Sequence, residues 1–482
     1  MSPAAGANGP STNGISTKTT NGAATNDTSQ EIPVTKLFAQ FIANATPHML
    51  NDALRTKVKE VVIDFIGVTA GAAKDAESTE SIVKGVRALG GDRGSSTVFL
   101  HGKNFLPQYA ALLNAAFGHS FDFDDTYAPG TLHAGVTAIS AALAQAELLG
   151  DDSTSDDFMI AVSVGYEVTC RLGRELGYEA YSQGMHNTAT AGIFGAVAAI
   201  SVLKRLSADV IEMAFGLAGS KAAGSMQYLE NGSWNKRMHP GFAAHDAFAC
   251  VALAEAGVIG ATKSIEGKFG FLHAYSPRQN KNMKLLTDHL GTDWAWLASS
   301  LKPYPACRMT HGFIEMAGKM GEIKREGVEH ITLTLNPQNY LLVGQTIPNK
   351  LHPRNSIDAQ FSAYYQTANA WLYGSHTGWK AYSRLHDEAL HALCDRISVE
   401  QDSECRNFEC RIHVRWRDGK EMEKVLVEPL GEVAHPFTRD KVDEKFHSLA
   451  DPVFGKKEAK TIIDMVDDIE RYSVVELLRL LQ

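Results

Sequence analysis

The chain has 482 residues with a formal net charge of −9 at pH 7, and 44% of them are hydrophobic and 21% charged. This length exceeds what one compact core holds, so we expect a globular protein of about two domains. The acidic balance, without a dense run of lysine or arginine, argues against a nucleic-acid partner.

The first 30 residues are rich in Ser, Thr, Asn, Gly and Ala, and they contain one lysine, Lys18, and no arginine. This composition lacks the apolar core of a secretory leader and the arginine-rich pattern of a mitochondrial presequence. We therefore expect residues 1–30 to be a disordered tail on a cytoplasmic rather than a mitochondrial protein. The six cysteines form no CxxC pair and are expected to be reduced thiols.

Residues 31–296 are dominated by helical spacing. Apolar side chains recur at helical intervals from Val58 to Ile66, which predicts a helix with one apolar face. Alanine and glycine are frequent in the helices that follow, so their axes can approach closely, and there is little strand pattern before residue 300. We expect further helices over residues 110–117, 136–149, 157–171, 188–204, 208–219 and 243–256. The most apolar run, 188–203, is short and ends at a Lys-Arg pair, which favours a buried helix over a membrane span.

Residues 297–433 have a different pattern. Segments in which every second residue is apolar, as in a strand, are interspersed with segments of helical spacing. An Asp418-Gly419 pair between two apolar segments is typical of a β-hairpin turn. We expect strands over 330–335, 411–416 and 424–427 and helices over 358–372 and 388–397. This part of the chain therefore predicts a smaller α+β domain that acts as a lid.

Residues 434–482 return to helical spacing, and Ser473 and Glu476 form a capping-box pattern before a leucine-rich turn. We expect these helices to pack back on the helical domain. The predicted fold class is therefore mainly α, with a large all-helical domain and a smaller α+β lid domain.

The stretch from residue 115 to 140, AAFGHSFDFDDTYAPGTLHAGVTAIS, places Asp122, Asp124 and Asp125 between His119 and His133. A carboxylate beside an imidazole in a partly dry pocket can shift the pKa of both groups toward neutrality, as proton transfer requires. The spacing alone leaves two interpretations open. One is an acid–base site, and the other is a solvated acidic loop that caps the next helix.

Two further segments combine histidine with features that suit an anion. In GMHNTATA, His186 opens an apolar helix, whose unpaired N–H groups and positive dipole end could hold an anion. In NKRMHPGF, Lys236, Arg237 and His239 lie just before the helix expected at residue 243, where fixed cations suit a di- or tricarboxylate. The alternatives are a helix-start histidine without a function and a solvated turn.

The segment KPYPACRMTHG begins at Lys302, at the expected junction of the two domains, where ligand pockets are common. Its Cys307 could be a nucleophile, although an unpaired cysteine is more often a small core residue. The sequence has no HExxH and no paired CxxC, and His119 with Asp122 is too small a set of ligands, so no metal site is expected.

Five segments follow one another in the order FDFDDT…LH, GMHNTATAGIFGA, NKRMHPGFAAH, KPYPACRMTHG and PRNSIDAQFS. In this order they resemble the MmgE/PrpD superfamily, which includes 2-methylcitrate dehydratase, cis-aconitate decarboxylase and iminodisuccinate epimerase. The resemblance runs from about Val34 to the C-terminus. It implies a helical domain, a smaller α+β lid domain, a pocket between them, usually a homodimer, and no metal or organic cofactor.

The resemblance also assigns acid–base roles to one set of residues and carboxylate binding to another. The acid–base set is Asp122, His133 and His186. The substrate-binding set is Lys236, His239, Lys302 and the lid tyrosine Tyr340, to which we add Arg237 and Cys307. At the position of Cys307 the animal decarboxylases have a histidine, whereas a fungal-type decarboxylase also has a cysteine.

These residues predict a cofactor-free lyase that decarboxylates cis-aconitate or an alkylated cis-aconitate-like acid. In this hypothesis the lysines hold the carboxylates of a small polycarboxylate substrate, and His133, oriented by Asp122, delivers a proton to carbon. His186 is the second acid–base candidate. The same groups also suit dehydration of a 2-alkylcitrate or epimerisation of an iminodisuccinate-like acid. An inactive carrier or scaffold with this fold is the alternative outside enzymes.

Overall fold

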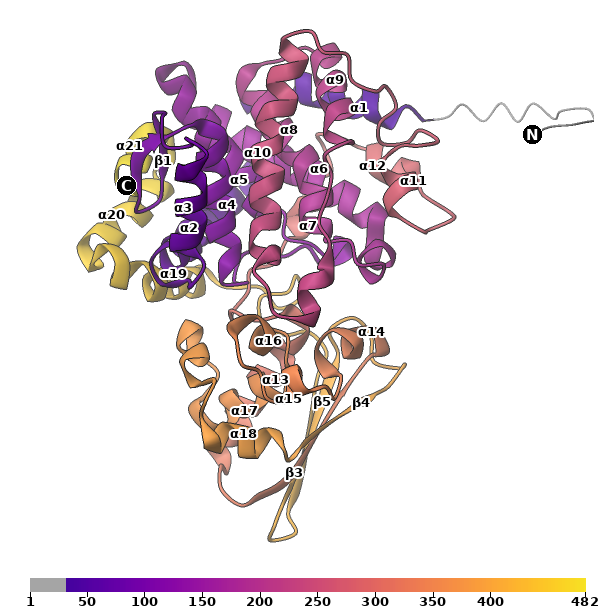
Figure 1. Cartoon of the computed structure of the whole chain (residues 1–482), viewed down its shortest axis with the longest axis vertical. Helices are drawn as coiled ribbons and strands as arrows, with labels where there is room; N and C mark the ends of the chain where they lie inside the picture. The colour runs from indigo at the N-terminus through magenta and orange to yellow at the C-terminus, as the bar shows by residue number, and fades with distance from the viewer. Residues whose placement is uncertain (1–31) are drawn as a thin grey trace, which may run out of the picture. The chain divides into compact units, whose positions relative to one another are not determined.

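The computed structural model describes residues 32–482, so the tail expected over residues 1–30 lies outside the described part of the chain. Within residues 33–482, helices form a larger body and a sheet with its own helices forms a smaller one (Figure 1). The fold is therefore mainly α with a smaller α+β domain, as the sequence predicts.

The centre of the larger body is a bundle of long helices rich in alanine and glycine. A Cβ atom on Gly195 would lie 2.5 Å from the carbonyl oxygen of Gly165, so these two helices could not pack this closely with larger residues. The bundle consists of α2 (Asp52–Asp75), α4 (Pro107–Ser120), α5 (Gly135–Leu149), α6 (Ser155–Ser182), α8 (Gly192–Lys204) and α10 (Asn235–Glu255). Around it lie α1 (Val34–Ala43), α3 (Thr79–Ala88), α7 (Asn187–Thr190) and α9 (Ala208–Ala218).

One stretch of the described residues, Asn187–Lys204, is long and apolar enough to cross a membrane by length and composition. In the structure it forms α7 and α8, and 94% of it is buried inside the bundle.

Three features of the larger body differ from expectation. Helix α10 begins at Asn235 rather than at residue 243, so it contains Lys236 and continues through Pro240. Helix α6 continues beyond residue 171 to Ser182, across a non-helical residue at Gly177. The body is also not purely helical, because β1 (Ser96–Val98) and β2 (Gly102–Phe105) form a short antiparallel ribbon. These strands have only three and four residues, too few for a period-two pattern to be recognised.

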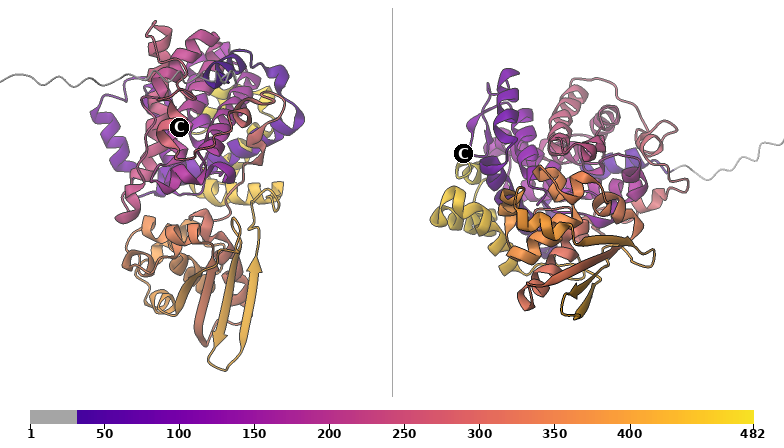
Figure 2. Two further views of the ribbon diagram at one scale, coloured as in Figure 1. Left: turned by 90° about the vertical axis from the view of Figure 1, so that its right-hand side faces the viewer. Right: turned by 60° about the horizontal axis from the view of Figure 1, so that its bottom comes forward.

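The smaller body contains a four-stranded sheet in the order β4-β3-β5-β6. Strand β3 (Val328–Leu335) is parallel to β4 (Ile397–Gln401) and antiparallel to β5 (Cys410–Trp416), which pairs with β6 (Glu421–Leu426). Gly419, with φ 80°, closes the hairpin between β5 and β6, which confirms the predicted turn. Helices α13 (His311–Ile323), α17 (Ala363–Tyr373) and α18 (Glu388–Cys394) pack beside the sheet (Figure 2).

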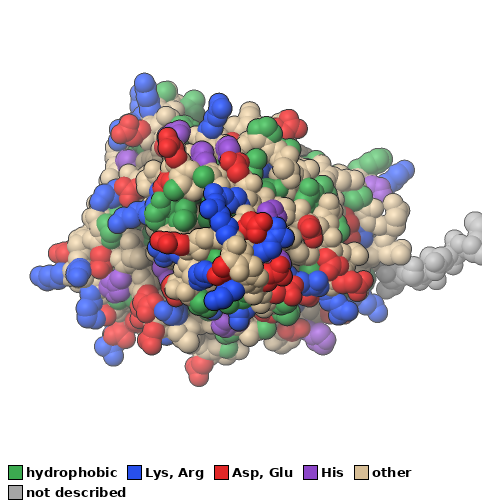
Figure 3. Space-filling view, turned by 90° about the horizontal axis from the view of Figure 1, so that it is seen from below, with side chains coloured by type: hydrophobic (Ala, Val, Ile, Leu, Met, Phe, Trp, Pro, Cys, Tyr) green, Lys and Arg blue, Asp and Glu red, His purple; other side chains and the backbone are tan. Residues whose placement is uncertain are grey.

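Acidic and basic side chains are interspersed on the lower face of the molecule, where the smaller body comes forward (Figure 3).

In the smaller body, the helices predicted over 358–372 and 388–397 are shorter than expected. The first is divided into α16 (Ser356–Gln360) and α17, and the second ends at Cys394, before strand β4 begins.

The last three helices, α19 (Arg439–Phe454), α20 (Lys456–Asp467) and α21 (Val474–Arg479), lie against the larger body (Figure 1). Lys445 Nζ in α19 lies 2.6 Å from Oδ1 of Asp64 in α2, and both side chains are buried. The predicted capping box between Ser473 and Glu476 is present at the start of α21.

Candidate active site

The acidic stretch connects α4 to α5, and its three carboxylates are buried. Asp122, Asp124 and Asp125 are 3%, 2% and 5% exposed, so the interpretation as a solvated loop is wrong. Helix α4 ends at Ser120, and Asp122 has a positive φ of 51°. This left-handed residue turns the chain back across the bundle, which places the three carboxylates among buried partners.

Asp122 lies between two buried lysines from different segments. Its Oδ1 is 3.0 Å from Nζ of Lys236 and 2.8 Å from Nζ of Lys302, and Lys302 also donates to the carbonyl oxygen of Asp122. Burial by itself would raise the pKa of Asp122, but the two ammonium groups outweigh it and hold the pKa well below its usual range. Asp122 is therefore ionised, and two cations share its one negative charge.

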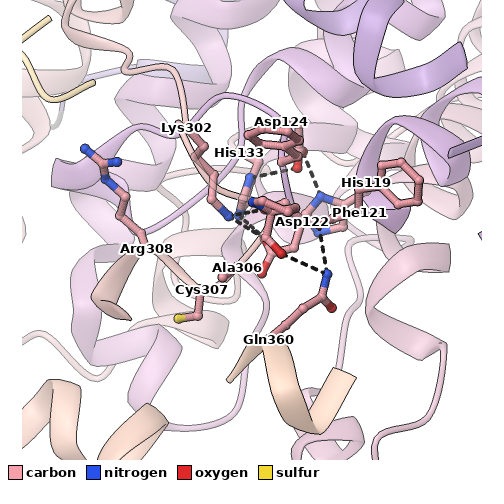
Figure 4. A network of polar contacts seen from close by, with 12 residues as sticks. His119, Phe121, Asp122, Asp124, His133, Lys302, Ala306, Cys307, Arg308 and Gln360 are labelled. Carbon is pink, nitrogen blue, oxygen red and sulfur yellow. Dashed lines mark hydrogen bonds and ion pairs between the residues drawn. The ribbon is translucent and has the colours of Figure 1, made fainter. Parts of the chain in front are cut away.

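A second group, His119, Asp124 and His133, lies directly beside Asp122 (Figure 4). His119 Nδ1 lies 2.7 Å from Oδ2 of Asp124, and His133 Nδ1 lies 3.3 Å from Oδ1 of the same carboxylate. Burial raises the pKa of Asp124, but the two imidazoles reverse this and hold it well below its usual range. One ionised carboxylate thus faces both imidazoles.

His133 is the member of this group that reaches open space. Its side chain is 12% exposed, and its Nε2 lies 3.6 Å from Oδ1 of Asp122. Because Asp124 is nearer to His133 than Asp122 is, and faces Nδ1, Asp124 is the better placed of the two to orient this imidazole. Asp122 also contacts His133, so the expected role of Asp122 in orienting this ring stays a prediction.

His186 and His239 form a buried pair next to this cluster. His186 directly precedes α7, and its Nδ1 lies 3.0 Å from Nδ1 of His239 in α10. Burial, together with neighbouring positive charge, lowers the pKa of His239 to about 4 and holds the pKa of His186 well below its usual range. Both rings are therefore neutral, and one donates the hydrogen that the other accepts.

These residues form one end of a cavity of about 640 Å³ between the two bodies. Six of the predicted site residues line it, namely Asp122, His133, His186, Lys236, Lys302 and Cys307. Much of the remaining wall is apolar or aromatic, and includes Leu132, Tyr178, Tyr181, Met309, Phe361, Phe408 and Val433. The cavity thus has a densely charged end, and the rest of its lining combines an apolar wall with further charged side chains, those of Glu179, Arg278, Arg308, Glu428 and Glu432.

Three predicted substrate contacts, Arg237, Tyr340 and His239, do not line this cavity. The guanidinium of Arg237 points elsewhere, where it donates to Ser78 and Ser356 and pairs with Glu77. Tyr340 lies at the start of the short segment Tyr340–Gly344 and packs against the core of the smaller body. His239 contacts His186, which does line the cavity.

Cys307 lines the cavity, but its environment does not suit a nucleophile. Burial raises the pKa of its thiol to about 11, so it is protonated at neutral pH. Its Sγ lies 3.6 Å from the sulfur of Met309 and points away from Asp122 (Figure 4). The side chain therefore lines the cavity and does not serve as a nucleophile.

His119, Asp124 and His133 could by residue type and spacing hold a metal ion, since one ligand atom of each lies within 4.8 Å of the others. Both nitrogens of His119 are already engaged, because Nδ1 contacts Asp124 and Nε2 lies 3.0 Å from the ammonium of Lys236. A metal bound at either nitrogen would have to displace its present contact, with Asp124 or with Lys236, so this arrangement fits acid–base chemistry better.

Two residues of the cluster were not among the predicted site residues, His119 and Asp124. The density of carboxylates and imidazoles between residues 119 and 133 indicated that this stretch was a site. It did not indicate which aspartate would face which partner, since that depends on the left-handed turn at Asp122.

Comparison with known proteins agrees with this architecture. Residues 36–284 match the MmgE/PrpD N-terminal domain and residues 304–471 match the MmgE/PrpD C-terminal domain. The chain therefore belongs to the MmgE/PrpD family. The second matched region includes α19 and α20, which lie against the larger body.

Individual relatives are similar over most of their length but at low identity. The chain is 25% identical to the cis-aconitate decarboxylase-like protein oryM of Aspergillus oryzae, over 94% of this chain and 98% of that protein. It is 25% identical to a cis-aconitate decarboxylase of Aspergillus terreus, over 80% and 84% of the two chains. It is 24% identical to the cis-aconitate decarboxylase of Mus musculus, over 91% of each.

Proposed function

We propose that this protein is a lyase that needs no cofactor and decarboxylates cis-aconitate or a cis-aconitate-like acid with an alkyl substituent. The observation that carries the proposal is the pair of buried lysines, Lys236 and Lys302, that share one carboxylate beside His133 in a common cavity. The names of the relatives at 24–25% identity support the same reaction class.

The charges of this cluster suit a polycarboxylate. Two ammonium groups face Oδ1 of Asp122, so one positive charge remains unbalanced by that carboxylate. An incoming carboxylate at the cavity end would complete the set with charge-assisted hydrogen bonds. Because the site is buried, these interactions are worth more than they would be in water.

In the proposed reaction, the bond from carbon to the departing carboxylate breaks, and its electron pair remains on the substrate as CO₂ leaves. The negative charge spreads into a neighbouring carboxylate, which Lys236 and Lys302 stabilise as it develops. Protonated His133 then gives its Nε2 proton to carbon, and water restores that proton. Asp124, 3.3 Å from Nδ1, fixes the ring and stabilises its protonated form.

The apolar wall supports an alkyl substituent on the substrate. Leu132, Met309 and Phe408 line the cavity of about 640 Å³ together with the charged residues, so its lining offers apolar contact as well as groups that would bind carboxylates. Ala128, a small residue, also lines the cavity. An alkyl chain along this wall would exchange water for apolar contact.

Dehydration of a 2-alkylcitrate is a second candidate, because the pair of His186 and His239 places a second imidazole next to the cavity. A base could then remove the proton beside a carboxylate while an acid protonates the departing hydroxyl. Both imidazoles of that pair are held neutral, which suits a base better than an acid.

The experiment that separates these candidates is incubation of the purified protein with cis-aconitate, 2-methylcitrate or iminodisuccinate in D₂O, followed by NMR. Decarboxylation of cis-aconitate, with an itaconate-like product, is the expected result. Water loss from 2-methylcitrate would favour the dehydratase, and deuterium exchange at the stereocentre of iminodisuccinate would favour an epimerase. Absence of any change, also with longer alkyl analogues, would favour a carrier.

A further inference from the structure

Three consecutive carbonyl groups in the acidic stretch each accept a hydrogen bond from a side chain of a distant segment. Gln360 Nε2 donates to the carbonyl of Phe121 at 2.8 Å, and Lys445 Nζ donates to that of Phe123 at 2.7 Å. Lys302 donates to the carbonyl between them, that of Asp122. One donor comes from the smaller body, one from the junction segment and one from a C-terminal helix.

These donors hold a backbone conformation that the chain would not keep unaided. Asp122 has φ 51°, a left-handed conformation that is unfavourable for residues other than glycine and persists only where the surroundings fix it. The same residue carries the carboxylate that Lys236 and Lys302 share. The position of that carboxylate therefore depends on how firmly residues 121–123 are held.

Gln360 makes the contact from the smaller body. It is the last residue of α16, it is fully buried, and its own carbonyl accepts from the backbone N–H of Cys307 at 2.9 Å. It thereby joins the stretch at residue 121 to the junction segment that carries Lys302. The ring of Trp379 adds a second contact from the smaller body, since it stacks on Phe121 with ring centroids 3.9 Å apart.

We propose that Gln360 is a positioning residue that holds the Phe121–Asp122 peptide, and with it the Asp122 carboxylate between the two lysines (Figure 4). It does not line the cavity, so it acts through Asp122. This inference rests on the proposed function only in taking Asp122 as part of the machinery. Through this contact, the position of the charged residues at the end of the cavity also depends on how the smaller body packs against the larger one.

The test compares Gln360→Met, which keeps the shape and removes the donor, with Gln366→Met. Gln366 is also a buried glutamine of the smaller body, but it donates to Ala359 and Tyr382 and not to the acidic stretch. In Gln360→Met, we expect kcat per folded molecule to fall roughly 10- to 100-fold, as displacement of a catalytic group does. KM should change less than about threefold, and kcat of Gln366→Met should stay near that of the wild type.

A third variant, Gln360→Glu, restores the donor only while the introduced carboxyl is protonated. Its kcat relative to the wild type should therefore fall as pH rises, whereas the ratio for Gln360→Met should be independent of pH. This dependence is not expected of a residue that only stabilises the fold. If Gln360→Met does not fold, this pH profile decides the question alone.

Hydrogen exchange of the peptide over residues 115–127 gives a readout that needs no substrate. Exchange should be faster in Gln360→Met than in the wild type and unchanged in Gln366→Met. Wild-type kcat in both Gln360 variants, or unchanged exchange in this peptide, would overturn the proposal. If the wild type converts none of the acids, the proposed function fails, while the exchange result still decides whether Gln360 holds residues 121–123.

Discussion

The ammonium group of Lys236 lies 3.0 Å from Nε2 of His119, a buried imidazole. Burial lowers the pKa of His119 to about 3, so the ring is neutral and Nε2 accepts the hydrogen from the lysine. Its one ring hydrogen is then on Nδ1 and is donated to Asp124, 2.7 Å away. The lysine thus fixes the tautomer of His119.

This tautomer has a consequence for His133. Asp124 accepts from His119 with Oδ2, which leaves Oδ1 to face His133 Nδ1 at 3.3 Å. The carboxylate therefore favours a hydrogen on Nδ1 of His133, and Nε2 remains for the substrate. Asp122, in contrast, has its Oδ1 occupied by two ammonium groups.

Replacing Asp124 should therefore affect turnover more than binding. In Asp124→Asn, we expect kcat to fall roughly 10²- to 10⁴-fold with little change in KM, because the neutral amide no longer stabilises a protonated His133. Steady-state kinetics with the accepted substrate measures both constants. Asp122→Asn is the matched comparison and should raise KM as well, since it disturbs the two lysines. Equal kcat values in Asp124→Asn and the wild type would show that Asp124 does not orient His133.

Lys302 should contribute to substrate binding as well as stabilise the charge that develops in the reaction, so its loss should raise KM and also lower kcat. Lys302→Met removes one of the two ammonium groups that would bind a substrate carboxylate. We therefore expect KM to rise roughly 10- to 100-fold, as loss of a charge-assisted hydrogen bond does. Lys319→Met is a suitable control, because that lysine lies in α13 of the smaller body with its side chain 71% exposed. A KM in Lys302→Met equal to that of the wild type would contradict this role.

Cys307 should be dispensable for chemistry. Because burial raises the pKa of its thiol to about 11, the fraction of thiolate at pH 7.5 is negligible and iodoacetamide should not inactivate the enzyme. Cys307→Ala should retain kcat within about threefold, as expected of a residue that makes no covalent intermediate. Loss of turnover in Cys307→Ala that Cys307→Ser restores would indicate a chemical role instead.

Asp125 should make stability depend on pH. Burial and the nearby carboxylates of Asp124 and Asp64 raise its pKa to about 8, from 3.8 for an unperturbed carboxyl. The folded protein thus holds a proton that the unfolded chain releases, so this stabilisation is present at low pH and is lost as pH rises from about 4 to 8. Asp125→Asn, which resembles the neutral acid, removes this dependence.

Urea denaturation of the wild type and Asp125→Asn between pH 5.5 and 8 tests this. The difference in free energy of unfolding should shift in favour of Asp125→Asn by roughly 3 kcal/mol over that range, since one proton per pH unit is worth about 1.4 kcal/mol. A difference that does not change with pH would mean that Asp125 is already ionised in the folded protein.

Much of the fold could be predicted from local pattern. The helices over 136–149 and 208–219, and the turn at Gly419, lie within a residue or two of their predicted places, since apolar periodicity and turn residues determine them locally. The start of α10 could not, because Pro240 and polar neighbours are typical of a loop, and only packing in the bundle holds them in a helix.

The same error explains the misplacement of Arg237. In a helix that begins at Asn235, Lys236 and His239 are three residues apart and share a face, whereas Arg237 is turned away by about 100°. With the helix expected at residue 243, all three side chains could face one ligand. Tyr340 could not be placed for a similar reason, since its direction depends on the irregular segment that follows Asn339.

The contact of Gln360 with Phe121 illustrates what no local pattern contains. The two residues are 239 positions apart, and each lies in a segment that merely resembles a short helix or a loop. The motifs indicated that both segments belong to the site, but the hydrogen bond arises from the seating of one body on the other.

The proposed reaction depends on His133, which would deliver a proton to carbon at a site that holds a polycarboxylate. The most direct test is turnover of cis-aconitate in D₂O by the wild type and by His133→Ala, with deuterium in the product measured by NMR. We expect one solvent deuteron at carbon in each wild-type product molecule, and a rate lower by at least about 10²-fold in a folded His133→Ala. If His133→Ala formed deuterated product at the same rate as the wild type, His133 would not be the residue that delivers the proton.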